Sequence, residues 1–301
     1  MPLVNTKVML EKALKGKYAI PAFNINNMET AKAIVFASEQ LKRDTIISAS
    51  EGAIEYAGAD MLYSMVKCLA EKSKVNFALH LDHGKSFESC KKAIDAGFTS
   101  VMFDGSSLPY DENVKITKRV VKYAHERNVT VEAELGKIIG VEDMVSSSTE
   151  HFTDPNEALD FVSKTGVDSL AISIGTAHGI NKGTTKPEIR FDIIDAVHKA
   201  IPTLPLVAHG SSSVPQDLVQ VINANGGDIK KSQGIPEETI SKMAKTAICK
   251  INIDTDLRLA FTSGVRTTLT SKPDAFDPRK YLGNGLNEIT KQALHIFSLL
   301  K

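Results

Sequence analysis

An apolar run that ends in polar residues stands out in the chain: Phe77-Ala78-Leu79-His80-Leu81-Asp82-His83-Gly84. Its first residues are typical of a buried strand. A carboxylate and an imidazole are costly to bury unless they are paired or bind a metal. Their position therefore indicates a chemical site at the end of a strand. His80, inside the run, is interpreted as a hydrogen-bonded core residue.

Short apolar segments of this kind alternate with helix-period segments along the chain. The predicted strands are residues 17–23, 45–50, 77–84, 100–103, 130–135, 167–174, 204–208 and 247–254. The predicted helices are residues 29–40, 59–71, 111–126, 154–164, 191–200, 215–224, 236–245, 255–270 and 285–300, with one more that ends at Gly97. This alternation predicts an α/β fold, a (β/α)8 TIM barrel that forms a single domain over residues 1–301 with extra C-terminal helices. A doubly wound open sheet is the alternative.

Polar residues follow most of the predicted strands. In a TIM barrel the C-terminal ends of the strands share one face, where the sites of such enzymes lie. We therefore expect these residues to converge: Asn24, Ser50, Asp82, His83, Asp104, Glu134, His178, His209, Asn252 and Asp254.

Three of the eight histidines stand beside glycine at predicted strand ends: His83, His178 and His209. Three histidines that converge from three strands suit a catalytic Zn²⁺, which keeps one position open for substrate or water. A structural zinc site would need a fourth ligand, usually Cys, and no Cys is near. The pattern favours a catalytic metal.

Residues 136–153 show no periodicity and contain Glu142. Long structureless loops in compact domains are usually functional or mobile. We predict a mobile loop over the site.

Glycine-containing segments after two strands offer backbone N–H groups to a phosphate: His178-Gly179 and His209-Gly210-Ser211-Ser212. A third segment, Asn252-Ile253-Asp254-Thr255-Asp256, lies at a predicted helix start, where the helix dipole favours an anion. Taken singly, each such segment is more often an ordinary glycine turn or helix cap than a phosphate site.

Composition excludes several classes of partner. Lys plus Arg and Asp plus Glu number 36 each, so no basic field is available for nucleic acid. No apolar run approaches the about 20 residues that span a bilayer, and the first residues do not resemble a secretory signal. We expect a cytoplasmic protein with no nucleic-acid or membrane partner. The three cysteines, Cys68, Cys90 and Cys249, are predicted to be buried, reduced thiols.

Five motifs together resemble one family. They are Leu81-Asp82-His83-Gly84, Val131-Glu132-Ala133-Glu134-Leu135-Gly136, Gly175-Thr176-Ala177-His178-Gly179, His209-Gly210-Ser211-Ser212 and Asn252-Ile253-Asp254-Thr255-Asp256. In this order they resemble the motifs of class II, zinc-dependent fructose-bisphosphate aldolases of the ketose-bisphosphate aldolase family. The resemblance covers nearly the whole chain.

This resemblance implies reversible cleavage of fructose 1,6-bisphosphate to dihydroxyacetone phosphate and glyceraldehyde 3-phosphate through a zinc-stabilised enediolate. It implies that His83, His178 and His209 hold the zinc and that Asp82 exchanges a proton with the C4 hydroxyl. Glu142 would handle the proton at C3. Asp104 and Glu134 match positions of an alternative or second metal.

The resemblance also implies a substrate-binding set. Arg258 would meet the distal phosphate and Asp254 would read hydroxyl stereochemistry, while Asn24 and Ser50 are further candidate substrate contacts. A monovalent cation, K⁺ or Na⁺, is implied near the loops of Gly179 and Ser212, and a homodimer or homotetramer by kinship. The C1 phosphate would be held by Gly179, Lys182, Gly210, Ser211, Ser212, Asn252 and Thr255.

Four alternatives stay open from the sequence. A tagatose-1,6-bisphosphate aldolase of the same family usually lacks the counterparts of Asp254 and Arg258. A class I aldolase needs a Schiff-base lysine, but Lys250 is interpreted as a packed or salt-bridged residue. A metal-dependent hydrolase would normally have an H-x-H pair on the first strand, where this chain has Phe23-Asn24. A phosphate-binding or partner-binding protein without enzymatic activity is the fourth.

Overall fold

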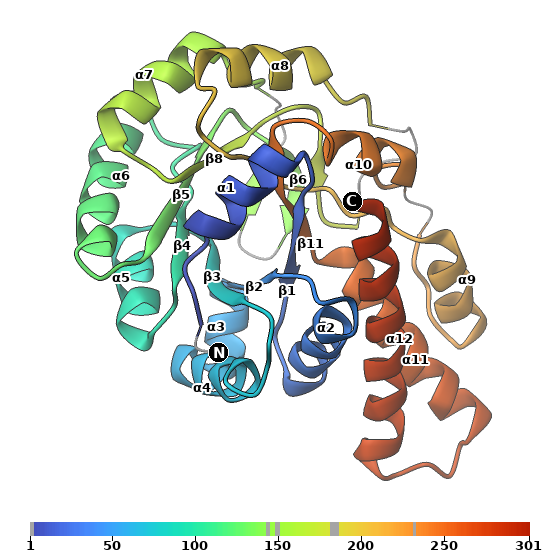
Figure 1. Cartoon of the computed structure of the whole chain (residues 1–301). Helices are drawn as coiled ribbons and strands as arrows, with labels where there is room; N and C mark the ends of the chain where they lie inside the picture. The colour runs from blue at the N-terminus through green and yellow to red at the C-terminus, as the bar shows by residue number, and fades with distance from the viewer. Residues whose placement is uncertain (1–2, 143–144, 148–150, 181–186, 231–232) are drawn as a thin grey trace.

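Eight parallel strands close into a barrel in the order β1-β11-β10-β8-β5-β4-β3-β2 (Figure 1). The computed structural model describes residues 3–142, 145–147, 151–180, 187–230 and 233–301. The strands of the barrel are β1 (Ile20–Asn24), β2 (Thr45–Ser50), β3 (Phe77–Gly84), β4 (Ser100–Phe103), β5 (Thr130–Leu135), β8 (Ser169–Ile172), β10 (Leu206–Ala208) and β11 (Ile248–Ile253). The predicted (β/α)8 fold is confirmed.

Helices surround this barrel. They are α2 (Met28–Leu41), α3 (Glu51–Ala57), α4 (Ala59–Ala70), α5 (Phe87–Ala96), α6 (Tyr110–His125), α7 (Pro155–Thr165), α8 (Phe191–Ala200), α9 (Gln216–Ala224) and α10 (Glu237–Met243). Local sequence explains the bounds of α5, because Ser86 and Ser89 form a capping box at its start and Gly97 ends it with a φ of 105°. Short α3, between β2 and α4, was not predicted.

Helix α1 (Lys7–Gly16) lies across one end of the barrel, in front of the strands in Figure 1. Its buried residues Met9, Leu10 and Ala13 belong to a core cluster with Ile20 and Ala78 of the strands. The sequence analysis did not predict α1. It closes the end of the barrel where the parallel strands begin.

The two C-terminal helices, α11 (Thr255–Ser271) and α12 (Pro278–Leu299), pack side by side and extend beyond the barrel (Figure 1). On the barrel side, Phe297 meets Phe23 of β1 edge to face, with ring centroids 5.5 Å apart. Helix α12 begins seven residues before the predicted start at residue 285. Asp277 accepts a hydrogen bond from the Arg279 N–H and Pro278 occupies the first turn, so the start is well capped.

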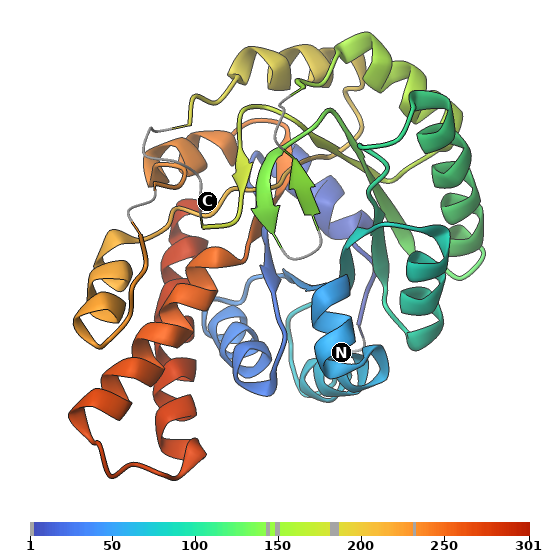
Figure 2. The same ribbon diagram turned by 180° about the vertical axis from the view of Figure 1, so that it is seen from behind.

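The described part of residues 136–153 contains short strands that the sequence analysis did not predict, whereas the mobility of this segment stays a prediction. Strands β6 (Ile139–Glu142) and β7 (Val145–Ser147) pair antiparallel, and β9 (Ala177–His178) pairs parallel to β6. Figure 2 shows this small sheet at the end of the barrel opposite α1. Residues 139–142 and 145–147 mix glycine, serine and glutamate with single apolar residues, so they form no apolar run of the kind that predicted the barrel strands.

The cysteine prediction is wrong at one position. Cys68 on α4 is exposed, whereas Cys90 and Cys249 are buried as expected. Burial raises the pKa of the Cys249 thiol to about 12. Among the described residues, no helix is both long and apolar enough to cross a membrane.

Candidate active site

Asp82, near the end of β3, is held by two amides, one from β1 and one from β11. Asn24 Nδ2 donates to Asp82 Oδ2 at 2.8 Å and Asn252 Nδ2 donates to Asp82 Oδ1 at 2.9 Å. Burial alone would raise the pKa of Asp82, but His83 and His209 outweigh it and hold the pKa below its usual range. Asp82 is therefore an ionised, oriented carboxylate.

His83 should point away from Asp82, since successive strand residues face opposite sides. Its backbone has a φ of 52°, and the register of β3 against β4 shifts between Leu81 and Gly84. This irregularity turns the ring toward the other candidate ligands: the centroid lies 4.5 Å from that of His209 and 4.9 Å from that of His178. Strained backbone of this kind often occurs at functional sites, which is consistent with a role for His83.

His178 reaches the same point from β9. Two glycines allow the chain to come this close, because a Cβ on Gly140 would lie 2.4 Å from the His178 carbonyl oxygen and one on Gly210 would lie 2.7 Å from that of Ala177. Both have positive φ, 110° and 62°. One nitrogen from each of His83, His178 and His209 lies within 4.8 Å of the others, and all three rings are buried.

The hydrogen bonds of two of these rings show which nitrogen faces the centre. His83 Nδ1 lies 2.9 Å from Asp104 Oδ2, and its buried Nε2 has no hydrogen-bond partner among the described residues. His209 Nε2 lies 2.7 Å from Glu132 Oε1, and its Nδ1 lies 3.8 Å from Asp82 Oδ1. Carboxylates that orient the far nitrogen are typical of metal-binding histidines. The predicted trio is thus brought together in a form that can hold a metal ion.

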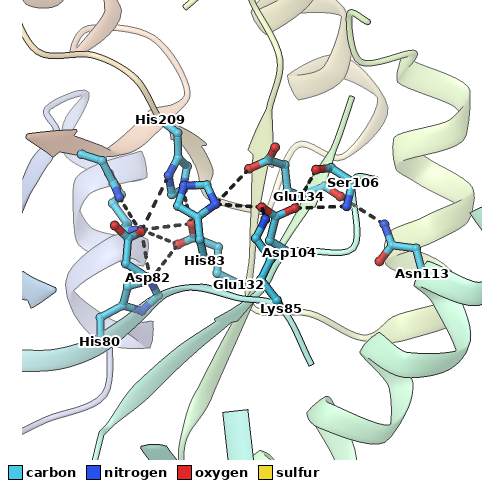
Figure 3. Close-up of polar contacts among 12 residues, drawn as sticks. His80, Asp82, His83, Lys85, Asp104, Ser106, Asn113, Glu132, Glu134 and His209 are labelled. Carbon is cyan, nitrogen blue, oxygen red and sulfur yellow. Dashed lines mark hydrogen bonds and ion pairs between the residues drawn. The ribbon is translucent and has the colours of Figure 1, made fainter. Parts of the chain in front are cut away.

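Buried polar side chains in the barrel interior, linked by hydrogen bonds and ion pairs, contact His209 (Figure 3). Lys250 Nζ lies 3.0 and 2.8 Å from the two oxygens of Glu132 and 3.2 Å from His80 Nε2. Burial, with Lys250, lowers the pKa of His80 to about 3, so this ring is neutral. Burial acts to raise the pKa of Glu132, but Lys250 and His209 lower it below the usual value. The interpretations of His80 as a core residue and Lys250 as salt-bridged are confirmed.

A second cluster with metal-ligand spacing is formed by His83, Asp104 and Glu134. Ser106 donates to Asp104 Oδ1 through its hydroxyl at 2.6 Å and its N–H at 3.1 Å. Lys85 Nζ donates to Asp104 Oδ2 at 2.6 Å. Burial and the charge of Asp104 raise the pKa of Glu134 to about 8. This cluster shares the His83 ring with the histidine trio.

A cavity of about 450 Å³ is lined by four predicted substrate contacts: Asn24, Ser50, Asp254 and Arg258. Arg258 Nε donates to Asp254 Oδ1 at 2.8 Å, and its terminal nitrogen lies 2.7 Å from Asp254 Oδ2. Asn24 lines this cavity and also donates a hydrogen bond to the carboxylate of Asp82. The cavity therefore lies next to the residues that hold Asp82.

Known proteins resemble this chain over nearly its whole length. The family described as "Fructose-bisphosphate aldolase class-II" matches residues 4–301. The chain belongs to the class-II fructose-bisphosphate aldolase family. The fructose-bisphosphate aldolase of Treponema pallidum is 49% identical, over 97% of this chain and 94% of that protein, and that of Giardia intestinalis is 46% identical, over 98% and 91%. The solved structure of the YdjI aldolase from Escherichia coli K12 has a TM-score of 0.81 at 29% identity and covers 99% of this chain and 97% of its own.

In this aldolase, the predicted phosphate-binding residues come from adjacent loops. Asp256 accepts hydrogen bonds from the Ser213 and Val214 N–H groups at 2.9 and 2.8 Å, which fixes the loop after His209. Ser212 Oγ accepts from the Asp254 N–H at 3.4 Å, so this loop meets the start of α11. These contacts place the loop that contains Gly210, Ser211 and Ser212 against the start of α11, where Asp254 and Thr255 lie.

Two predicted site residues of the aldolase are not placed. Lys182 lies outside the described residues. Glu142 is the last residue of β6, and its side chain is not part of the description. Gly179 follows His178 directly and has a φ of 75°.

Two residues were not singled out from the sequence: Glu132, which contacts His209, and Lys85, which contacts Asp104, the partner of His83. Glu132 carries a signal that was available, since it lies two residues before Glu134 and so faces the same side of β5. Lys85 follows the Asp82-His83-Gly84 motif by one residue, and nothing in its local pattern indicates that its ammonium turns back to Asp104.

Proposed function

We propose that this aldolase reversibly cleaves fructose 1,6-bisphosphate to dihydroxyacetone phosphate and glyceraldehyde 3-phosphate, a reaction of glycolysis and gluconeogenesis. The observation that carries the proposal is the buried trio of His83, His178 and His209, with ring nitrogens within 4.8 Å of one another beside an ionised Asp82. The curated relatives named above carry this activity in their names.

We assign Zn²⁺ to His83, His178 and His209. Three imidazoles leave a coordination position for substrate, as catalytic zinc sites do. When bound, the ion supplies Lewis acidity that stabilises negative charge on the oxygens next to the bond being cleaved. Asp104 and Glu132 orient the rings of His83 and His209 through the nitrogens that face away from the centre.

Asp82 is the proposed base for the C4 hydroxyl. Two amide donors orient its carboxylate, and its pKa lies below the usual range although burial acts to raise it. An ionised carboxylate retains free lone pairs after accepting one hydrogen bond on each oxygen, so it can still accept the proton of a hydroxyl. Glu142 is proposed to handle the proton at C3.

The two phosphates are assigned to opposite parts of the site. Arg258 would neutralise the distal phosphate, while Asp254, which holds its guanidinium, would read the hydroxyl stereochemistry. Asn24 and Ser50 line the cavity between. The C1 phosphate would be bound by the N–H and hydroxyl groups of the loops and by one ammonium: Gly179, Lys182, Gly210, Ser211, Ser212, Asn252 and Thr255.

Further parts of the proposal rest on the sequence and kinship. They are a monovalent cation, K⁺ or Na⁺, near Gly179 and Ser212, a homodimer or homotetramer, a cytoplasmic location, a single domain over residues 1–301, and the lack of nucleic-acid and membrane partners. Gel filtration with light scattering tests the oligomeric state.

The deciding experiment measures cleavage of fructose 1,6-bisphosphate before and after EDTA, with zinc added back and tagatose 1,6-bisphosphate assayed in parallel. We expect activity that EDTA removes and zinc restores, with fructose preferred. Preference for tagatose would transfer the assignment to the tagatose enzyme. Activity that survives EDTA and is lost to borohydride with substrate would indicate a Schiff base, although Lys250 is buried in an ion pair. No activity on either sugar would refute the proposal.

A further inference from the structure

The ammonium of Lys85 lies in the cluster of His83, Asp104 and Glu134 (Figure 3). Its Nζ is 2.6 Å from Asp104 Oδ2, and the same oxygen is 2.9 Å from His83 Nδ1. Asp104 is buried, whereas the Lys85 side chain is 32% exposed. The lysine therefore reaches from the surface and places its charge against a buried carboxylate.

If Lys85 were absent, the three residues of this cluster could bind a second divalent ion. The candidate ligand atoms of the three residues lie within 4.8 Å of one another and all three are buried. Glu134 is 1% exposed, and its Oε2 has no hydrogen-bond partner among the described residues. Each of these buried carboxyl groups is costly to bury in its charged form unless a cation balances the charge.

We propose that Lys85 is a tethered cation that occupies this second site and so limits the chain to one divalent ion per subunit. The inference rests on the proposed zinc ligands His83, His178 and His209. The new element is that the cluster of His83, Asp104 and Glu134 binds the ammonium of Lys85 instead of a second metal ion.

Geometry makes the two cations exclusive. A divalent ion bound to Asp104 Oδ2 would have to displace both the ammonium at 2.6 Å and the His83 N–H at 2.9 Å from that oxygen. A tethered group competes at a high effective concentration, because it is held beside the site by the chain. The same contact keeps Asp104 charged and available to orient His83.

The test counts bound metal by equilibrium dialysis against Co²⁺ or Zn²⁺ followed by elemental analysis. We expect one equivalent per subunit for the native chain and two for Lys85→Met, which keeps an unbranched side chain of nearly the same length and removes its charge. Lys85→Arg should bind one, because it keeps the charge. The matched control is Lys91→Met, which removes the ammonium partner of exposed Asp95 on α5 and should also bind one.

A count of one for Lys85→Met at every metal concentration would overturn the inference, as would a count of two for the native chain. The second equivalent should disappear in Lys85→Met/Asp104→Asn, and its persistence there would place the extra ion elsewhere. If Lys85→Met does not fold, Lys85→Gln takes its place with the same expected counts.

His178→Ala tests the underlying ligand set separately, since His178 belongs only to the first cluster. It should remove the single equivalent of the native chain. Retention of that equivalent would refute the proposed zinc ligands, whereas an unchanged count in Lys85→Met refutes only the role of Lys85.

Discussion

Lys250 and Glu132 form an ion pair inside the barrel, with Nζ 2.8 Å from Oε2 and both side chains almost fully buried. The other oxygen of Glu132 lies 2.7 Å from His209 Nε2. Glu132 thus contacts both the buried ammonium of Lys250 and the ring of His209, a proposed metal ligand. Stability and metal binding should therefore respond together when this pair is disturbed.

Lys250→Met should lower the free energy of unfolding of the zinc-free protein by about 3–5 kcal/mol, because it leaves the buried Glu132 charge without its partner. Urea unfolding monitored by circular dichroism measures the change. The double variant Lys250→Met/Glu132→Gln should recover part of the loss, since it removes the unpaired charge. A single variant as stable as the native chain would show that the pair contributes nothing.

Asp82→Ala should keep the metal and lose about 10²–10⁴-fold in kcat, the usual contribution of a positioned general base. Its carboxylate is oriented by Asn24 and Asn252 but is not one of the proposed zinc ligands. Steady-state cleavage assays and elemental analysis on the same sample separate the two effects. Near-normal turnover with full zinc content would remove Asp82 from the mechanism.

His209→Ala should release the metal, because it removes one of only three proposed ligands. Competition with a chromophoric chelator measures the affinity. His295→Ala is the control, since His295 is half exposed on α12 and pairs with Glu237 at 2.7 Å, away from the site. Stoichiometric zinc in His209→Ala would show that the ligand set is wrong.

The sequence predicted the strands and the face on which the site lies because each strand is short, apolar and ends in polar residues. The positions of Asp82 and His209 in the site could be predicted from the strand ends alone. The orientation of His83 does not, since it depends on a left-handed backbone at one residue. Helix α1 was missed because its short apolar face resembles that of any surface segment.

Contacts between distant segments account for the rest. Lys250 and Glu132 are 118 residues apart, and their pairing is visible only once the barrel is closed. The same holds for Lys85, whose partner Asp104 directly follows β4, the next strand of the barrel wall. Local patterns predict which residues stand at a strand end, but not which of them touch.

Arg258→Ala should raise the KM for fructose 1,6-bisphosphate far more than the KM for dihydroxyacetone phosphate in the synthesis direction. The guanidinium lies in the cavity beside Asn24 and Ser50, where only the longer substrate would place its second phosphate. Steady-state kinetics in both directions test this, with Arg119→Ala on α6 as a control for the loss of an exposed arginine. Because Asp254 holds Arg258 through two contacts, Arg258→Lys should not restore the native KM, since an ammonium cannot reproduce the planar fork. Equal increases in both KM values would place the arginine outside the distal phosphate site.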